Sequence, residues 1–282
     1  MVAHASRCVA TVEQIRPLAK NTWAVRFHAP ALAQSIVPGQ FFMIRPEDGA
    51  DPLLGRPFAL FDVIRDSAGT ARSVEFGFVA VGKLTTLMSQ WKPGEQVRIW
   101  GPLGNGFPAP DCRHLICVAG GIGQTPFLAV AREALGLSTY GTSDRNRGSR
   151  PQTVDLLYGV RSREYLAGLQ EFQIEGLNLQ IATDDGSAGH HGFVTDLLRS
   201  RLHEERASTH VYCCGPEPMM HAVAEICAAA NIPCWLSLET PMACGFGACF
   251  SCVTKVREPD GSWDYRRTCV EGPVFPAERL IL

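Results

Sequence analysis

Four cysteines near the end of the chain have the spacing of an iron–sulfur site. Cys244, Cys249 and Cys252 follow a C-x4-C-x2-C pattern, and Cys269 comes after sixteen further residues. This triplet is the spacing with which plant-type ferredoxins hold a [2Fe–2S] cluster. Glycines at 245 and 247 permit the tight bends that turn backbone N–H groups toward the sulfides. The pattern therefore predicts that all four cysteines are metal ligands.

A structural zinc site is the main alternative for these cysteines. Zinc ligands usually come as two short-spaced pairs, whereas here one C-x2-C pair stands with two outlying cysteines. The spacing favours iron–sulfur and leaves zinc, or unligated core cysteines, open. Most other cysteines lie in or beside apolar segments, where a small buried hydrophobe is the default: Cys8, Cys112, Cys117, Cys213, Cys227 and Cys234.

A glycine-rich turn is the second motif that could do chemistry. In ICVAGGIGQTPFLAV, Gly120, Gly121 and Gly123 stand between an apolar run and a helical pattern. Such a turn can bring backbone amides and a helix N-terminus against a pyrophosphate. The match to G-x-G-x-x-G is incomplete, because Pro126 takes the place of the third glycine. An ordinary strand–helix turn stays open as the alternative.

Two more polar segments end apolar runs in the same part of the chain. Asp184 lies in Thr-Asp-Asp-Gly, and Cys214 and Gly215 open Cys-Gly-Pro. The carboxyl ends of parallel strands meet at one edge of a sheet, where such sheets bind ligands. These segments therefore strengthen the prediction of a nucleotide site.

Cations and helix-start residues mark the first half of the chain. Arg56 begins a β-rich run with Pro57, Phe58 and Ala59, and it supplies one fixed cation. A helical stretch is opened by a possible anion-binding segment: Gly82, Lys83, Leu84, Thr85 and Thr86. A solvated arginine and an ordinary threonine cap are the simpler alternatives.

The secondary-structure elements predicted to carry these motifs follow two different patterns. The first hundred residues predict short strands with Pro-Gly turns, at 22–28, 41–44, 56–64, 74–81 and 96–100, and one helix at 84–91. Closely spaced strands of this kind predict a small antiparallel barrel. From about residue 112, strands at 114–119, 154–158, 178–182 and 210–213 alternate with helices at 125–135, 164–172, 194–202 and 218–230. This alternation predicts a parallel sheet with helices on both faces.

Length and composition set the outer bounds. The 282 residues favour two domains and a small third module, with limits at 1–110, 111–236 and 237–282. Lysine plus arginine (26) nearly balances aspartate plus glutamate (28), so there is no basic field for nucleic acid or an anionic membrane. No apolar run is long enough to span a bilayer. Eleven cysteines without a signal-peptide pattern indicate a reducing, cytoplasmic setting.

Together these motifs, in this order, resemble the ferredoxin–NADP reductase-like superfamily. Within it, the ending looks very like the electron-transfer subunit of NAD-dependent dihydroorotate dehydrogenase. The segment from Glu239 through MACGFGACFSC to CVEGPVF carries that likeness, because the last gap between cysteines is shorter than in an isolated plant-type ferredoxin. The resemblance implies an antiparallel Greek-key flavin barrel, a parallel-sheet nucleotide-binding domain and a small C-terminal [2Fe–2S] module.

The resemblance also assigns roles to residues. Arg56 would pair with a flavin phosphate, and Pro57, Phe58 and Ala59 would shape the isoalloxazine pocket. The pyrophosphate of FAD would be held by Gly82, Lys83, Thr85 and Thr86. The nicotinamide nucleotide site would be lined by Gly120, Gly121, Gly123, Asp184, Cys214 and Gly215, with Cys214 as the catalytic residue. The chain departs from the family at Ala59, where Ser or Thr is usual, and at Leu84, where a second glycine is common.

The expected function is electron transfer between NAD(H) and a partner enzyme. NADH exchanges two electrons as hydride and a [2Fe–2S] cluster passes one at a time, whereas FAD can do both. By resemblance, the partner is a separate FMN-containing dihydroorotate dehydrogenase catalytic subunit of pyrimidine biosynthesis, joined in a hetero-oligomer. Two alternatives stay open: a reductase subunit with the same cofactors serving an oxygenase, hydrogenase or ferredoxin-linked transhydrogenase, and a zinc-stapled, non-enzymatic binding module. Arg161 and Arg163 could meet a 2′-phosphate, so NADP stays open beside NAD.

Overall fold

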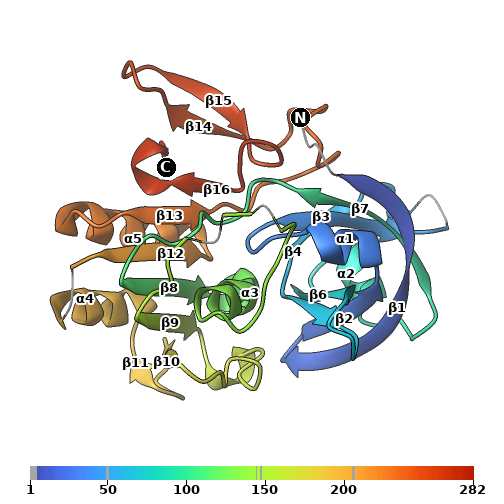
Figure 1. Cartoon of the computed structure of the whole chain (residues 1–282), viewed down its shortest axis with the longest axis horizontal. Coiled ribbons are helices and arrows are strands. Elements are labelled where there is room, and N and C mark those ends of the chain that lie inside the picture. The colour runs from blue at the N-terminus through green and yellow to red at the C-terminus, as the bar shows by residue number, and fades with distance from the viewer. Residues whose placement is uncertain (1–4, 49–50, 144, 147, 205–206) are drawn as a thin grey trace.

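The computed structural model describes residues 5–48, 51–143, 145–146, 148–204 and 207–282. Its strands form two seven-stranded sheets and one two-stranded sheet. Figure 1 shows the two large sheets beside one another, with the two-stranded hairpin above them. Within the described residues, no helix is long and apolar enough to cross a bilayer.

The first sheet is antiparallel throughout and curls around an aromatic core. Its order is β4-β3-β7-β1-β2-β6-β5. The strands are β1 (Ser6–Ala19), β2 (Thr22–His28), β3 (Phe41–Pro46), β4 (Arg56–Ala59), β5 (Asp62–Arg65), β6 (Ala71–Val79) and β7 (Gln96–Leu103), with short helices α1 (Pro30–Ser35) and α2 (Lys83–Met88). Phe27, Phe42, Phe58 and Phe76 fill the interior. The predicted antiparallel flavin-barrel fold is confirmed.

The prediction for this half was wrong in two places. The strand expected at 56–64 is two strands, because the chain turns at Leu60 and Phe61. Both side chains are fully buried, yet Leu60 packs in the barrel core and Phe61 in the core of the second sheet. The long first strand, β1, was not predicted.

The second sheet is parallel except at one edge, in the order β11-β10-β9-β8-β12-β13-β16. Its strands are β8 (His114–Gly120), β9 (Thr153–Val160), β10 (Leu177–Thr183), β11 (His190–His191), β12 (Thr209–Cys214), β13 (Cys234–Ser237) and β16 (Val274–Pro276), with α3 (Thr125–Ala134), α4 (Val194–Glu204) and α5 (Glu217–Ala230). Phe127 of α3 packs in one apolar layer, and Leu198 and Val223 of α4 and α5 pack in another. Helices therefore cover both faces, as predicted.

The helix expected at 164–172 does not form. Only a short 3-10 turn, η2 (Arg163–Tyr165), is present, and bends and turns follow it. Gly168 interrupts the segment with a φ of 72°, in the left-handed region that an α-helix cannot contain. The buried Ala167 and Phe172 fill the core from this irregular segment instead.

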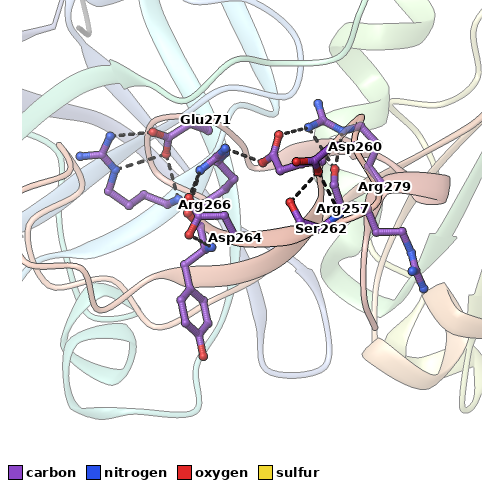
Figure 2. A network of polar contacts seen from close by, with 10 residues as sticks. Arg257, Asp260, Ser262, Asp264, Arg266, Glu271 and Arg279 are labelled. Carbon is purple, nitrogen blue, oxygen red and sulfur yellow. Dashed lines mark hydrogen bonds and ion pairs between the residues drawn. The ribbon is translucent and has the colours of Figure 1, made fainter.

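The C-terminal segment bridges both large sheets. After the cysteine loop come β14 (Val253–Arg257), β15 (Trp263–Arg267), β16 and the 3-10 turn η3 (Ala277–Arg279). Strand β16 adds antiparallel to β13, at the edge of the parallel sheet. Arg266 and Arg279 share the carboxylate of Glu258, so the β14–β15 hairpin is tied to the end of the chain (Figure 2).

Candidate functional site

The four cysteines lie in two segments at the end of the chain. Three of them belong to the loop between β13 and β14, and the fourth lies in the turn after β15. Cys252 and Cys269 are buried, Cys244 is half-buried and Cys249 is exposed. One side of the site, at Cys252 and Cys269, is therefore buried in the protein, and the other side, at Cys249, is accessible from solvent.

The four cysteine thiols affect one another's pKa. Cys244 lowers the pKa of Cys249, and Cys252 and Cys244 both raise the pKa of Cys269. A hydrogen bond with Ser251, whose Oγ lies 3.1 Å from the Cys249 sulfur, and the contact with Cys244 lower the pKa of Cys249 to about 6. Burial, followed by the neighbouring Cys252 thiol, raises the pKa of Cys269 to about 12. The four cysteines therefore belong to one site.

Four cysteine sulfurs from two neighbouring segments are the donor set of a [2Fe–2S] cluster. A structural zinc site needs four ligands around one ion, whereas a [2Fe–2S] cluster has two cysteine ligands on each of two irons. Cys244, Cys249, Cys252 and Cys269 would together hold such a cluster, which would supply one-electron transfer.

The cysteine loop packs directly on the barrel sheet. The indole Nε1 of Trp100 donates a hydrogen bond of 2.9 Å to the carbonyl oxygen of Cys244. A Cβ atom on Gly245 would lie 2.6 Å from Cγ of Met43, so the loop backbone leaves no room for a side chain here. The apolar side chains of this contact form one cluster: Phe41, Met43, Leu103, Met242, Cys252 and Cys269. The loop and the barrel therefore form one packed unit.

The first predicted flavin segment lies on the same side of the barrel. In the β3–β4 pair, Ala59 lies opposite Phe41, and Pro57 lies opposite Met43. Residues opposite one another in a sheet point to the same face. Pro57 and Ala59 therefore share the face on which the cysteine loop packs.

The other two residues of β4 are placed differently. The ring of Phe58 is buried in the barrel core, with its centroid 4.7 Å from that of Phe76. Arg56 is exposed, and its guanidinium donates to the carbonyl oxygens of Leu54 (3.2 Å) and Gly55 (3.0 Å). Phe58 is thus part of the core, and Arg56 is an exposed cation beside the 51–55 loop.

The second predicted flavin segment begins α2. The hydroxyl oxygen of Thr85 accepts hydrogen bonds from the backbone N–H groups of Gly82 (2.9 Å) and Val81 (3.0 Å). Thr85 therefore caps the helix start, as in the simpler of the two alternatives. Thr86 is exposed one residue further along.

Lys83 connects the two flavin segments. Its ammonium group forms an ion pair with Asp51, in the 51–55 loop that leads into Arg56. Two cations that are 27 positions apart in the sequence, Arg56 and Lys83, therefore lie beside one short loop. This arrangement suits an anion held between β4 and α2.

The predicted nucleotide residues gather at the carboxyl edge of the parallel sheet. Gly120 ends β8, Gly121 and Gly123 lie in the 3-10 turn η1 (Gly121–Gln124), and Gly215 follows the adjacent strand β12. A Cβ atom on Gly123 would lie 2.3 Å from the carbonyl oxygen of Cys214, and one on Gly215 would lie 2.9 Å from the backbone nitrogen of Gly120. The backbones of the two loops therefore approach closely, and the side chain of Met219 fills the space beside Gly120 and Gly215.

Gly121 differs from its neighbours. Its φ is 56°, and a Cβ atom placed on it would meet nothing within 4 Å. Gly120 and Gly123 are thus required by the protein's own packing, whereas Gly121 presents bare backbone to open space. This is the point of the turn where a phosphate group could approach closely.

Cys214 and Asp184 occupy the same edge at different distances from the turn. Burial raises the pKa of the Cys214 thiol to about 12, against a hydrogen bond with Ser237 that lowers it. The sulfur is therefore a neutral thiol near pH 7, not a thiolate nucleophile. Asp184 is exposed after β10, two strands away from β8. The structure brings Cys214 to the glycine turn and leaves Asp184 apart from it.

The comparisons with known proteins agree with these three regions. The iron-sulfur cluster binding domain of dihydroorotate dehydrogenase B matches residues 239–281, and an oxidoreductase NAD-binding domain matches residues 117–225. The electron transfer subunit of dihydroorotate dehydrogenase B (NAD(+)) from Desulforamulus reducens is 36% identical over 274 residues, covering 96% of this chain and 97% of that protein. A homologue from Aquifex aeolicus is 36% identical over 252 residues, covering 89% and 88%. The chain belongs to the family of dihydroorotate dehydrogenase B electron-transfer subunits.

Solved structures place this family member in a wider fold group. A NADH-dependent reduced ferredoxin-NADP oxidoreductase is similar with a TM-score of 0.79 and 26% identity, covering 97% of this chain and 90% of that one. A ferredoxin NADP+ reductase from Neisseria gonorrhoeae has a TM-score of 0.62 and 16% identity, covering 81% and 92%, and shows the fold alone. The predicted three-part architecture is confirmed.

Family membership also confirms the predicted chemistry. The chain is an NAD-linked oxidoreductase subunit that uses FAD and a [2Fe–2S] cluster, with NAD(H) as its nucleotide. Family membership therefore excludes the alternative of a zinc-stapled, non-enzymatic binding module. The role of each individual site residue, including the four cysteines, stays a prediction from motif and geometry.

Some residues that build the site were not predicted. Trp100 reaches Cys244 across 144 positions of sequence. Asn105 donates from its amide nitrogen to the carbonyl oxygen of Val274 (2.7 Å) and from its backbone to that of Gly272 (2.7 Å). No local pattern marks such long-range partners. Ser251 could have been found, because its place between two ligand cysteines suits a hydroxyl that bonds to sulfur.

Proposed function

We propose that this chain passes electrons between NAD and an FMN-containing dihydroorotate dehydrogenase catalytic subunit, and that they run from dihydroorotate to NAD⁺. The proposal rests on one observation: the cysteine loop packs on the same face of the barrel sheet that carries Pro57 and Ala59. The relatives are named as electron transfer subunits of dihydroorotate dehydrogenase B (NAD(+)), which supports NAD over NADP.

We assign the site residues by region. Cys244, Cys249, Cys252 and Cys269 would hold the [2Fe–2S] cluster. The FAD would be held by Arg56, Pro57, Phe58, Ala59, Gly82, Lys83, Thr85 and Thr86. The NAD site would comprise Gly120, Gly121, Gly123, Cys214 and Gly215, with Asp184 at its far margin. Bound FAD supplies the exchange between hydride and single electrons, and the protein's part is to hold the three groups in order.

Organisation and location complete the proposal. The domain limits are 1–110, 111–236 and 237–282, although β16 of the last module pairs with β13 of the preceding one. All eleven cysteines are free thiols in the structure, which suits the reducing cytoplasm.

Reconstitution with the catalytic subunit tests this function. The chain, purified anaerobically, should contain FAD and iron, and it should copurify with the FMN-containing subunit. The complex should then reduce NAD⁺ at the expense of dihydroorotate, and neither subunit alone should do so. A chain that keeps FAD and iron but yields no NADH with that subunit would show that the partner is wrong.

One second candidate has specific support. The likeness to a NADH-dependent reduced ferredoxin-NADP oxidoreductase over 97% of the chain favours a subunit that serves a ferredoxin-linked transhydrogenase. The same preparation distinguishes the two, because reduced ferredoxin in place of dihydroorotate would then drive nucleotide reduction.

A further inference from the structure

One arginine contacts both segments that carry the cysteines. Arg267 ends β15, two residues before Cys269. Its Nη1 donates a hydrogen bond of 3.2 Å to the carbonyl oxygen of Gly247, inside the cysteine loop. Its guanidinium carbon lies 5.1 Å from the centre of the Phe250 ring, between Cys249 and Cys252 in the sequence. A single side chain therefore ties the cysteine loop to the strand that leads into the fourth cysteine.

Glu271 holds the same guanidinium from the other side of Cys269. Nη2 and Nε of Arg267 donate to the two carboxylate oxygens at 2.6 and 3.3 Å. The backbone N–H of Arg267 also donates to this carboxylate at 2.8 Å, and the backbone N–H of Glu271 donates to the carbonyl oxygen of Arg267 at 2.9 Å. Figure 2 shows the Glu271 carboxylate turned into this network. Arg267 and Glu271 thus close the turn that contains Cys269.

We propose that Arg267 is a positioning residue of the iron–sulfur site and that its charge raises the midpoint potential of the cluster. A cluster on four thiolates is anionic and gains one more negative charge on reduction, so a nearby cation stabilises the reduced form more. Hydrogen bonds and charges around a metal site tune its potential in this way. The inference rests on the cluster assigned above and does not depend on the identity of the partner.

A purely structural role is the competing explanation. A half-exposed ion pair of this kind often contributes little to stability. The neighbouring Arg266 offers the matched control, because successive side chains of a strand point to opposite faces. Arg266 pairs with Glu258 and with Asp264 (2.7 Å), on the hairpin side of the network (Figure 2). Within the residues that the structure describes, Arg266 forms no hydrogen bond or ion pair with the cysteine loop.

Redox titration of the cluster, followed by EPR in the purified full-length chain, tests the proposal. Arg267→Gln should lower the ratio of reduced to oxidised cluster at a fixed ambient potential by about tenfold, which is about 59 mV for a one-electron couple. Arg266→Gln should leave that ratio at the wild-type value. Arg267→Lys should keep most of the ratio, because the charge remains, but should release iron faster, because lysine has no planar fork to hold Gly247 and Glu271 together.

The double variant separates charge from geometry. Arg267→Gln with Glu271→Gln removes both charges, so its potential should lie between those of wild type and Arg267→Gln. Loss of iron from Arg267→Gln, with iron retained in Arg266→Gln, would also support the positioning role. An Arg267→Gln protein with the iron content, EPR spectrum and midpoint potential of Arg266→Gln would overturn the proposal. Absence of iron from the wild-type chain would instead overturn the proposed function.

Discussion

The cysteine loop and the carboxyl edge of the parallel sheet differ in the groups they present, side chains in the first and backbone in the second. In the loop, the predicted ligands are side chains, because two segments of the chain bring four cysteine sulfurs to one site. At the sheet edge, the predicted binding surface is backbone. A Cβ atom on Gly120, Gly123 or Gly215 would lie 2.7, 2.3 or 2.5 Å from its nearest neighbouring atom, so each of the three positions requires glycine. The residues of a site built from side chains can be recognised in the sequence, whereas those of a site built from backbone can be recognised only once the packing around them is known.

Removing one cysteine is expected to have the largest effect. Cys249 is exposed, so Cys249→Ala opens no cavity, yet it leaves one iron with an open position. Iron and the EPR signal of the reduced protein should be lost, while FAD content and flavin reduction by NADH persist. Cys8→Ala, at a half-buried free cysteine on β1, is the control. A Cys249→Ala protein with a full complement of iron would show that Cys249 is not a ligand of the cluster.

Adding one methyl group at Gly123 should be the next largest change. Its Cβ would lie 2.3 Å from the carbonyl oxygen of Cys214, so the η1 turn or β12 must shift. Overpacking of this kind costs up to about 3 kcal/mol. Gly123→Ala should lower the denaturant midpoint and slow flavin reduction by NADH. Gly123 is not one of the positive-φ glycines, so its replacement adds no left-handed strain, and a Gly123→Ala protein as stable as the wild type would contradict the packing argument.

The flavin segments lie between these two extremes, since they combine two cations with a helix start. If Arg56 meets a flavin phosphate, Arg56→Ala should weaken FAD binding by about 10- to 100-fold, as expected for a charge-assisted contact. Dilution of the purified protein, followed by flavin fluorescence, measures the release of FAD. Arg72→Ala, at an exposed arginine of β6 that pairs with Asp66, is the control. Equal FAD retention in the two variants would remove Arg56 from the site.

The success of sequence reasoning follows the same division. The alternation of strands and helices and the curled antiparallel sheet leave local patterns in hydrophobic period. The spacing of the four cysteines is also a local pattern, and their role as ligands stays a prediction. The break between β4 and β5 leaves no local pattern, because Leu60 and Phe61 are both apolar. Only the structure shows that Leu60 packs in one core and Phe61 in the other. The missing helix at 164–172 could not be foreseen either, because a glycine in a sequence does not reveal that its φ will be positive, as it is at Gly168 (72°).

Long-range contacts were beyond prediction for a related reason. The hydrogen bond from Trp100 to Cys244 and those from Asn105 to the 272–274 segment join parts of the chain more than 140 residues apart. The first attaches the cysteine loop to the barrel, and the others attach the start of β16 to it. A single sequence carries the identity of each partner but not the pairing.

Gly121 gives the smallest expected effect and the sharpest test of the backbone site. Its φ of 56° strains any L-residue, yet its Cβ would meet nothing within 4 Å. Gly69, in the turn between β5 and β6, has a φ of 79° and the same open surroundings, so Gly121→Ala and Gly69→Ala should each cost about 1–2 kcal/mol of stability. Only Gly121→Ala should raise the KM for NADH, because its methyl group stands where a phosphate would approach the turn. Reduction of the cluster by dithionite should be normal in both proteins. If the two variants reduce flavin with the same KM for NADH, the nucleotide does not approach this turn, and the carboxyl edge owes its glycines to packing alone.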